Sequence, residues 1–162
     1  MGGGQGLGPI KTIVKSLEKS EYDIQELIVT GTNKKLYRSL KRKIKHYKKD
    51  IRLFGFLENI HELMRVSGVI ISKPGGVTTA EVLSMGLPMV IIKPIPGQEA
   101  NNTNFLTSKA AAIKVDEPKE AHQVIDELLK DKAKLGRLAQ AAAKIAKPNA
   151  SLDIAKLLLA LP

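Results

Sequence analysis

Short apolar runs divide the chain at regular intervals, with room for one helix between successive runs. The runs at 69–71 and 89–92 contain no polar position, which is typical of strands buried on both faces of a parallel sheet. Further strands are predicted at 26–29, 51–54 and 112–115. Helices are predicted from Pro9, over about 34–48, 60–67, 79–85 and 118–130, and twice more before Leu161. This alternation predicts an α/β domain with a Rossmann-like, doubly wound parallel sheet and right-handed crossovers.

The length of 162 residues suits a single domain and is too short for two domains of ordinary size. We therefore interpret residues 1–162 as one domain. The chain opens on a glycine-rich loop from Gly2 to Gly8, and a loop of this type normally follows a buried strand, which is not seen here. We expect from this that the chain is a fragment and that a further domain lies upstream.

The opening loop has the composition of an anion site. Gly4, Gly6 and Gly8 lead into the first predicted helix, and such a loop lets backbone N–H groups approach an anion at the positive end of the helix dipole. No register of the glycines gives G-x-G-x-x-G. Gly3 and Gly8 have the P-loop spacing, but Pro9-Ile10 follows where Lys-Ser/Thr is required. A merely tight loop therefore remains an alternative.

Two polar loops follow the central strands, at 72–76 and at 94–104. Loops at the carboxyl ends of parallel strands line one edge of the sheet, where ligands bind. In the first loop, the paired glycines and the free N–H groups of Gly76, Val77 and Thr78 suit a phosphate, and Glu81 suits a ribose diol. The alternative is structural: 78–81 reads T-x-x-E, a capping box in which Glu81 satisfies the start of the helix.

The second polar loop gathers amide and carboxyl groups. Such groups suit sugar hydroxyls, which both donate and accept hydrogen bonds. The alternative is a helix start with polar caps at Asn101 or Asn102. The residues concerned are Gln98, Glu99, Asn101, Asn102 and Asn104.

Basic residues outnumber acidic ones by 26 to 16, so the formal net charge is +10. This charge points to anionic partners: nucleotide phosphates, nucleic acid or an acidic membrane surface. Much of it lies on the predicted helix 34–48, where Leu36, Leu40 and Ile44 form a core-facing stripe and most other positions are Lys or Arg. A solvated surface helix and a membrane-surface helix both fit this pattern. Scarce aromatic residues weaken single-strand nucleic-acid binding, which depends on stacking.

The absence of cysteine excludes a disulfide framework and a Cys-based metal or redox site, and it favours a cytoplasmic setting. The apolar runs are far shorter than the roughly 20 residues that span a bilayer. The glycine-rich start does not resemble a secretion signal. We therefore expect a soluble, unsecreted protein.

Several of these segments, taken together, resemble the C-terminal half of the diacylglycerol glycosyltransferases. These are the bacterial processive glucosyltransferases and plant-type monogalactosyldiacylglycerol synthases, relatives of the peptidoglycan N-acetylglucosaminyltransferase. The resemblance covers nearly the whole chain in the same order, and the Pro-Gly-Gln-Glu loop is its most specific part. It implies the two-domain GT-B architecture, with the acceptor bound mainly by an N-terminal domain that is absent from this chain. The matching segments are Gly2–Pro9, Gly55-Phe56-Leu57, Ser72–Gly76, Glu81 and Lys93–Glu99 with Asn102 and Asn104.

The resemblance also implies a role for each loop. The opening loop would face the diphosphate, the backbone after the strand 51–54 would lie by the uracil, and the loop before the central helix would bind phosphate. Glu81 would hold the ribose, and the second polar loop the hexose. The implied donor-binding residues are Gly4, Gln5, Gly6, Gly8, Gly55, Phe56, Gly75, Gly76, Val77, Thr78, Glu81, Gln98, Glu99 and Asn102.

The implied reaction is inverting transfer of glucose or galactose from UDP to diacylglycerol or to a glycolipid already made. No cofactor or metal is expected, because the sequence contains no Asp-x-Asp and N–H groups can stabilise the departing UDP. The general base is expected on the N-terminal domain, and His46, His61 and His122 are interpreted as surface or structural residues. The enzyme would act at the inner face of the cell membrane as a peripheral protein.

Two rival interpretations remain. One is an enzyme that uses UDP-N-acetylglucosamine, either the peptidoglycan transferase or a 2-epimerase of the same fold. The other is a basic module that binds nucleic acid or an anionic membrane. The sequence does not distinguish glucose from galactose, since Glu99 and Asn102 suit either sugar.

Overall fold

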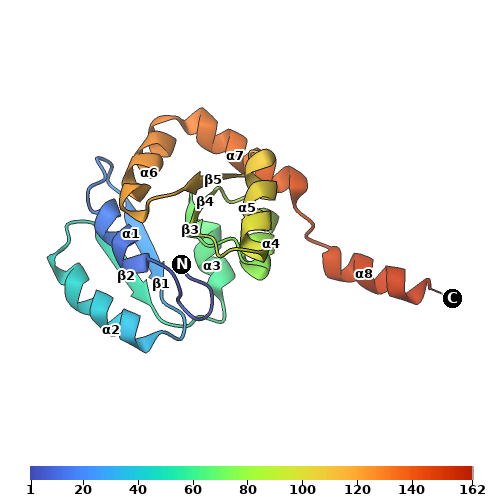
Figure 1. The fold of residues 1–162 in the computed structure, drawn as a ribbon, viewed down its shortest axis with the longest axis horizontal. Coiled ribbons are helices and arrows are strands. Elements are labelled where there is room, and N and C mark those ends of the chain that lie inside the picture. Colours follow the sequence, from blue (N-terminus) through green and yellow to red (C-terminus); the bar gives the residue numbers. More distant parts are fainter. Residues whose placement is uncertain (162) are drawn as a thin grey trace.

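The computed structural model describes residues 1–161, and its strands confirm the predicted α/β alternation (Figure 1). Each predicted strand is present to within one residue at either end. The additional residues, such as Asp50 and Ser72, lie at strand ends. The strands are β1 (Gln25–Val29), β2 (Asp50–Phe54), β3 (Ile70–Ser72), β4 (Met89–Ile92) and β5 (Ala112–Val115).

Helices precede, separate and follow the strands. Two short 3-10 turns, Ile44–His46 and Pro118–Glu120, adjoin α2 and α6. The first of these turns ends α2 at Lys43, five residues before the predicted end of that helix. The helices are α1 (Ile10–Leu17), α2 (Lys34–Lys43), α3 (Ile60–Val66), α4 (Gly76–Ser84), α5 (Gln98–Ser108), α6 (Ala121–Lys130), α7 (Lys132–Ile145) and α8 (Ala150–Leu159).

The sheet is parallel and consists of two sections. β1 pairs with β2 from Gln25↔Asp50 to Val29↔Phe54, while β3, β4 and β5 pair in that order. Backbone pairing stops between β1 and β3. The parallel arrangement is therefore as predicted, with an interruption that the hydrophobic pattern did not indicate.

β4 lies at the centre of the core and is buried on both faces, as its uninterrupted apolar run predicts. Met89 and Ile91 pack in one cluster with α3, α4, α5 and α7. Val90 and Ile92 pack in another with α1, α6 and α7. A third cluster joins α1 and α2 to the section formed by β1 and β2. Helices therefore cover both faces of the sheet, as in a doubly wound fold.

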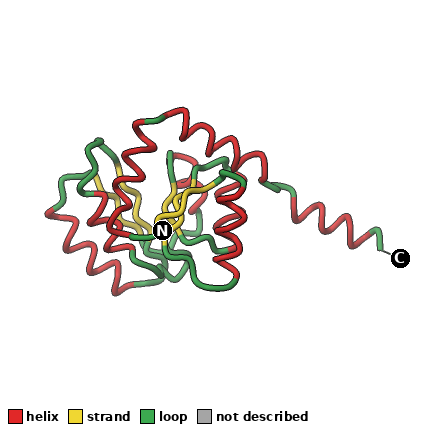
Figure 2. The backbone as a smooth tube through the Cα atoms, turned by 45° about the horizontal axis from the view of Figure 1, so that its top comes forward, coloured by secondary structure: helices red, strands yellow, loops and turns green. Residues whose placement is uncertain are grey.

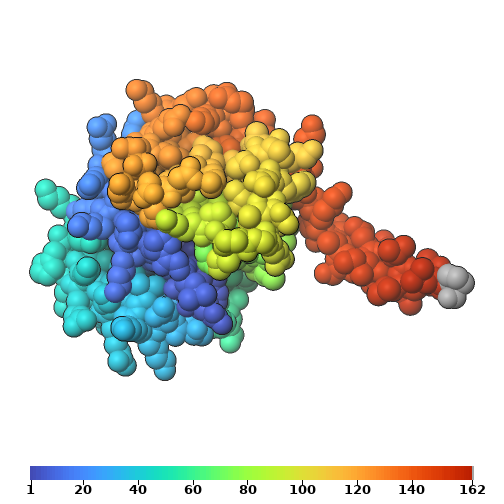
Figure 3. Space-filling view, in the orientation of Figure 1, coloured from blue at the N-terminus to red at the C-terminus, as the bar shows by residue number. Residues whose placement is uncertain are grey.

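The helix α8 stands away from this body (Figures 1 and 3). None of its residues is buried, although it is rich in leucine. Its exposed apolar side chains are Leu152, Ile154, Leu157, Leu158 and Leu159.

One acidic side chain is buried near the sheet. Glu26 on β1 is only 6% exposed, and its Oε1 finds no hydrogen-bond partner among residues 1–161. Burial, reinforced by the nearby Glu18 carboxylate and opposed by Lys49, raises the pKa of Glu26 to about 7. The folded protein therefore holds a proton on Glu26 at mildly acidic pH, where the unfolded chain releases it.

This proton predicts a pH-dependent stability. Between pH 4.5 and 7 the folded state binds more protons at Glu26 than the unfolded state, so the free energy of unfolding falls as pH rises. Glu26→Gln mimics the protonated acid. The wild type's free energy of unfolding should fall by an amount on the order of 3 kcal/mol across this range, and the variant should not show this decrease. Urea unfolding of both proteins at several pH values measures the difference. A variant whose stability follows the wild-type pH profile would contradict the assignment.

Candidate functional site

Four loops meet at the carboxyl edge of the parallel strands, where a ligand site was predicted. Figure 2 shows loops from several parts of the chain gathered along one side of the sheet. Distances measured at three glycines show that these loops lie close together. A Cβ added at Gly4 would lie 3.9 Å from Phe56, one at Gly8 would lie 3.9 Å from Lys73, and one at Gly76 would lie 3.5 Å from the amide of Gln98. The structure therefore brings the four sequence-predicted segments together.

The opening loop is fixed against the end of β1. The backbone N–H of Thr32 donates to the carbonyl of Gly4 at 2.8 Å. Gly6 is buried with a φ of +58°, and a Cβ there would lie 1.9 Å from the carbonyl oxygen of Thr30. Only glycine fits this close approach. Buried Gly6 therefore sets the shape of the loop. The other predicted site residues of the loop, Gly4, Gln5 and Gly8, are exposed to solvent.

The helix α4 begins at Gly76, three residues before its predicted start. Its N-cap is Gly75 in an extended conformation, and no side chain caps it. The N–H groups of Gly76, Val77 and Thr78 therefore have no acceptor within the helix. A Cβ added at Gly75 would meet no atom within 4 Å, so the cap position itself is not crowded.

This start overturns the capping-box interpretation. Thr78 is the third residue of α4 and not its cap, and Glu81 lies more than one turn into the helix. The Glu81 side chain is half-buried, and it makes no hydrogen bond or ion pair within the described part of the chain. Its carboxylate is available to a ligand.

The second polar loop is shorter than predicted, because α5 begins at Gln98 and includes Asn101, Asn102 and Asn104. Its cap is Gly97 with a φ of +94°, so the alternative of polar caps at Asn101 or Asn102 is also wrong. Gln98 is exposed at the first turn of α5. The predicted hexose-binding residues thus lie on a helix start, which is a more rigid platform than a loop.

Two of these residues connect α5 to the loop after β3. The Glu99 carboxylate forms an ion pair with Lys73 at 3.0 Å and accepts a hydrogen bond from the N–H of Ile95 at 2.8 Å. The Asn102 amide donates to the carbonyl of Pro74 at 2.8 Å. Glu99 and Asn102 therefore fix the start of α5 against the loop after β3 and the loop after β4.

Lys73 is a site residue that the sequence interpretation did not single out. Its side chain is 15% exposed and that of Glu99 is 17% exposed, so the pair is largely shielded from water. Lys73 also lies beside Gly8 and places a cation between the opening loop and α5. The sequence feature that could have identified Lys73 is its position directly after β3, at the edge of the sheet where ligands bind.

The histidines lie elsewhere, as interpreted from the sequence. His122 Nδ1 is 2.9 Å from the hydroxyl of Ser16, in a contact between α6 and α1. His46 and His61 are exposed. Each therefore has a structural or surface position.

Solved structures with the same arrangement identify the class of fold. MurG of Acinetobacter baumannii aligns with a TM-score of 0.81 at 21% identity, over 99% of this chain and 49% of MurG. HepE of Anabaena, solved in complex with UDP-glucose, aligns with a TM-score of 0.72 at 18% identity, over 96% of this chain and 47% of HepE. The fold is that of one half of a GT-B glycosyltransferase.

The family follows from the sequence. Residues 1–158 match the glycosyltransferase family 28 C-terminal domain, and the chain belongs to that family. It is 33% identical over 153 residues to the processive diacylglycerol beta-glucosyltransferase of Bacillus cytotoxicus, covering 94% of this chain and 39% of the relative. It is 37% identical over 139 residues to the enzyme of that name from Bacillus licheniformis, covering 85% and 36%. The chain thus spans less than two fifths of the length of these relatives, and the family resemblance seen in the sequence is confirmed.

Proposed function

We propose that this chain is the donor-binding domain of an inverting glycosyltransferase that transfers glucose or galactose from UDP to diacylglycerol or to a glycolipid. The observation that carries the proposal is the convergence of the uncapped start of α4, the opening loop and the free Glu81 carboxylate at one sheet edge. The names of the relatives supply the acceptor and favour glucose as the sugar.

The diphosphate would bind at the start of α4. The N–H groups of Gly76, Val77 and Thr78 lie at the uncapped start of the helix, and a Cβ placed on the cap residue Gly75 would meet no atom within 4 Å. The helix dipole adds about 0.3–1 kcal/mol, so direct hydrogen bonds supply most of the affinity. The exposed residues of the opening loop, among them Gly4, would face the same phosphates.

The nucleoside would lie across the end of β2. Glu81 has two carboxylate oxygens free to accept hydrogen bonds from both hydroxyls of the ribose. Gly55 and Phe56 follow β2 directly, and Phe56 is 60% exposed beside Gly4. The backbone at Gly55 and Phe56 would therefore pair with the uracil edge.

The hexose would meet the start of α5. The exposed Gln98 amide offers both a donor and an acceptor. Glu99 and Asn102 already bind Lys73, Ile95 and Pro74, so they would hold sugar hydroxyls through the remaining lone pairs of Glu99 and the free amide oxygen of Asn102. Internal contacts of this kind fix the side chains before the sugar arrives, which favours tight positioning.

In the reaction, an acceptor hydroxyl oxygen forms a bond to the anomeric carbon while the bond from that carbon to the UDP oxygen breaks. The hydroxyl proton passes to a general base, which we assign to an N-terminal acceptor domain of the complete enzyme. The N–H groups at α4 stabilise the charge that develops on the departing UDP. In this account the diphosphate requires no metal ion.

Calorimetric titration tests the donor site. We expect the chain to bind UDP, and Glu81→Ala and Gly75→Ala each to weaken binding at least tenfold, because one removes the ribose acceptor and the other fills the phosphate space. Gly136→Ala, the same change within α7 at a position where a Cβ also meets no atom within 4 Å, is the matched control for Gly75→Ala and should bind as the wild type does. EDTA should leave the affinity unchanged.

Thermal melting must show that each variant is folded. Folded variants that bind UDP with wild-type affinity would contradict the site. Comparing UDP-glucose, UDP-galactose and UDP-N-acetylglucosamine then identifies the donor, and a clear preference for the last would favour the rival class of enzyme.

We further propose that α2 contacts an anionic membrane surface. Leu36 and Leu40 are buried, so the apolar face of α2 is already covered by the domain. None of the ion pairs within residues 1–161 uses a basic residue of α2. No helix in that part of the chain has the length and hydropathy to cross a bilayer. The exposed basic residues of α2 are Lys34, Lys35, Arg38, Lys41, Arg42 and Lys43.

Vesicle sedimentation tests this contact. Each Lys or Arg near anionic lipid contributes about 1 kcal/mol, so Lys41→Glu with Arg42→Glu should reduce binding to phosphatidylserine vesicles at least tenfold. The control, Lys130→Glu with Lys144→Glu, makes the same change in net charge on α6 and α7. Equal losses of vesicle binding in the two double variants would mean that only net charge matters, and this would contradict a specific contact of α2.

A further inference from the structure

Three segments of the chain meet at the Glu99 carboxylate. Its Oε1 forms the ion pair with the Lys73 ammonium at 3.0 Å, and its Oε2 accepts a hydrogen bond from the N–H of Ile95 at 2.8 Å. Lys73 lies in the loop after β3, Ile95 lies in the loop after β4, and Glu99 lies in the first turn of α5. Glu99 is therefore held from two sides, and each of its oxygens keeps a lone pair for a further donor.

The loop after β4 is strained where Glu99 holds it. Lys93 has a φ of +47°, a left-handed conformation that is unfavourable for a residue with a side chain, and Gly97 has a φ of +94°. Such a conformation persists only where neighbouring contacts fix the backbone. The hydrogen bond from Ile95 to Glu99 is a contact of this kind, because it holds the loop between its two left-handed residues.

Lys73 supplies the charge that keeps Glu99 in this position. Both side chains are largely shielded from water, so solvent weakens their attraction less than it weakens that of a surface pair. Within residues 1–161, Lys73 makes no other hydrogen bond or ion pair. Loss of the Lys73 ammonium would leave a shielded carboxylate without its cation, which is costly, so the Glu99 side chain would turn toward water.

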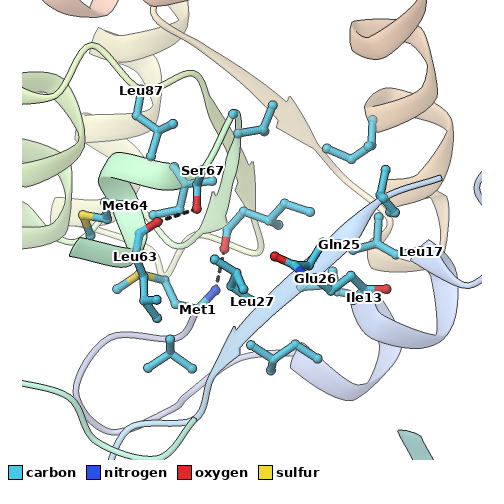
Figure 4. A pocket seen from close by; sticks show the side chains of 18 of the residues that line it. Met1, Ile13, Leu17, Gln25, Glu26, Leu27, Leu63, Met64, Ser67 and Leu87 are labelled. Carbon is cyan, nitrogen blue, oxygen red and sulfur yellow. Dashed lines mark hydrogen bonds between the residues drawn. The ribbon is translucent and has the colours of Figure 1, made fainter. Parts of the chain in front are cut away.

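The apolar cavity between β1 and β3 does not offer a second place for a sugar. Its volume is about 340 Å³, and Lys73, Glu99 and Ile95 are not among its lining residues (Figure 4). Among the described residues, its polar lining side chains are those of Gln25, Glu26 and Ser67. A hexose carries hydroxyls around its whole ring, and most of them would lack partners in this cavity. Sugar recognition therefore depends on polar side chains at the carboxyl edge of the sheet.

We propose that Lys73 is a positioning residue that determines which hexose the site prefers, because it fixes the Glu99 carboxylate. Glucose and galactose differ in the direction of one hydroxyl, so a carboxylate held in one place favours one of the two sugars. A mobile carboxylate adapts to either sugar and distinguishes them less. This inference rests on the proposed donor site and adds to it the cause of its sugar preference.

The alternative role for Lys73 is direct contact with the diphosphate. Its ammonium has three N–H donors, of which Glu99 takes one. The opening loop is also close, since a Cβ added at Gly8 would lie 3.9 Å from the Lys73 side chain. A phosphate contact would contribute equally to the binding of UDP, UDP-glucose and UDP-galactose. A positioning role instead changes the ratio of the affinities for the two sugar donors.

Calorimetric titration of Lys73→Met with UDP, UDP-glucose and UDP-galactose tests the proposal. We expect the wild type to favour one sugar donor roughly tenfold or more, and Lys73→Met to favour it less than about threefold, because Glu99 is no longer fixed. Lys73→Arg retains a cation beside Glu99 and should keep most of the preference. The matched control is Lys134→Met, which removes the same charge from the ion pair of α7 with Glu127 and should keep the wild-type preference.

The possible results separate this inference from the donor site. Wild-type sugar preference in Lys73→Met would overturn the inference, and so would equal losses of affinity for UDP and both sugar donors, which indicate a phosphate contact. A wild-type chain that binds UDP but does not distinguish the two sugars would overturn the inference and leave the UDP site intact. A wild-type chain that binds none of the three would contradict the donor site, and the inference with it.

Hydrogen exchange measures the hold on Glu99 without a ligand. The Ile95 amide should exchange roughly tenfold faster or more in Lys73→Met, and close to the wild-type rate in Lys73→Arg, because Glu99 is its acceptor. Amides of α7 should stay unchanged in both variants. Unchanged exchange at Ile95 in Lys73→Met would overturn the proposal. Equally faster exchange throughout the chain would also overturn it, because Lys73 would then support the whole fold and not Glu99 in particular.

Discussion

The burial of β4 is the constraint on which the rest of the structure depends. Val90 and Ile91 are completely buried on opposite faces, and fully burying a side chain of this size contributes roughly 1.5–3 kcal/mol. A strand buried on both faces must have neighbours on both sides and helices above and below, so β3, β5 and their crossover helices follow from it. Because these strands are parallel, the loops that begin α4 and α5 emerge at the same edge. The candidate site is a consequence of that geometry.

Much of the fold was predictable because buried parallel strands leave a direct signal in the sequence. Apolar runs located every strand. Those at 69–71 and 89–92 are uninterrupted, and β4 has no solvent-facing position, whereas those at 26–29, 51–54 and 112–115 each contain one charged residue. The starts of α4 and α5 were not predicted. The capping box at 78–81 is a local pattern, but the extended conformation of Gly75 begins the helix earlier. The polar run in α5 resembled a loop because only Thr103 and Leu106 of that helix are buried, too few for a visible helical period.

The segments of the site were predictable, whereas their mutual contacts were not. Lys73 and Glu99 are far apart in the sequence, and their ion pair depends on how the ends of β3 and β4 lie side by side. The same limit applies to the interruption of the sheet between β1 and β3. Hydrophobic pattern predicts which segments are strands, but it does not specify which edges pair.

The most direct test of the central claim is an NMR titration of the isotopically labelled chain with UDP, following assigned backbone amides. The account predicts saturable shifts concentrated at Gly76, Val77 and Thr78, with smaller ones at Gly4 and Phe56. Amides of α7 should stay unchanged. Shifts confined to the basic face of α2 would contradict the account, because the nucleotide would then be attracted by charge alone and not held at the start of α4.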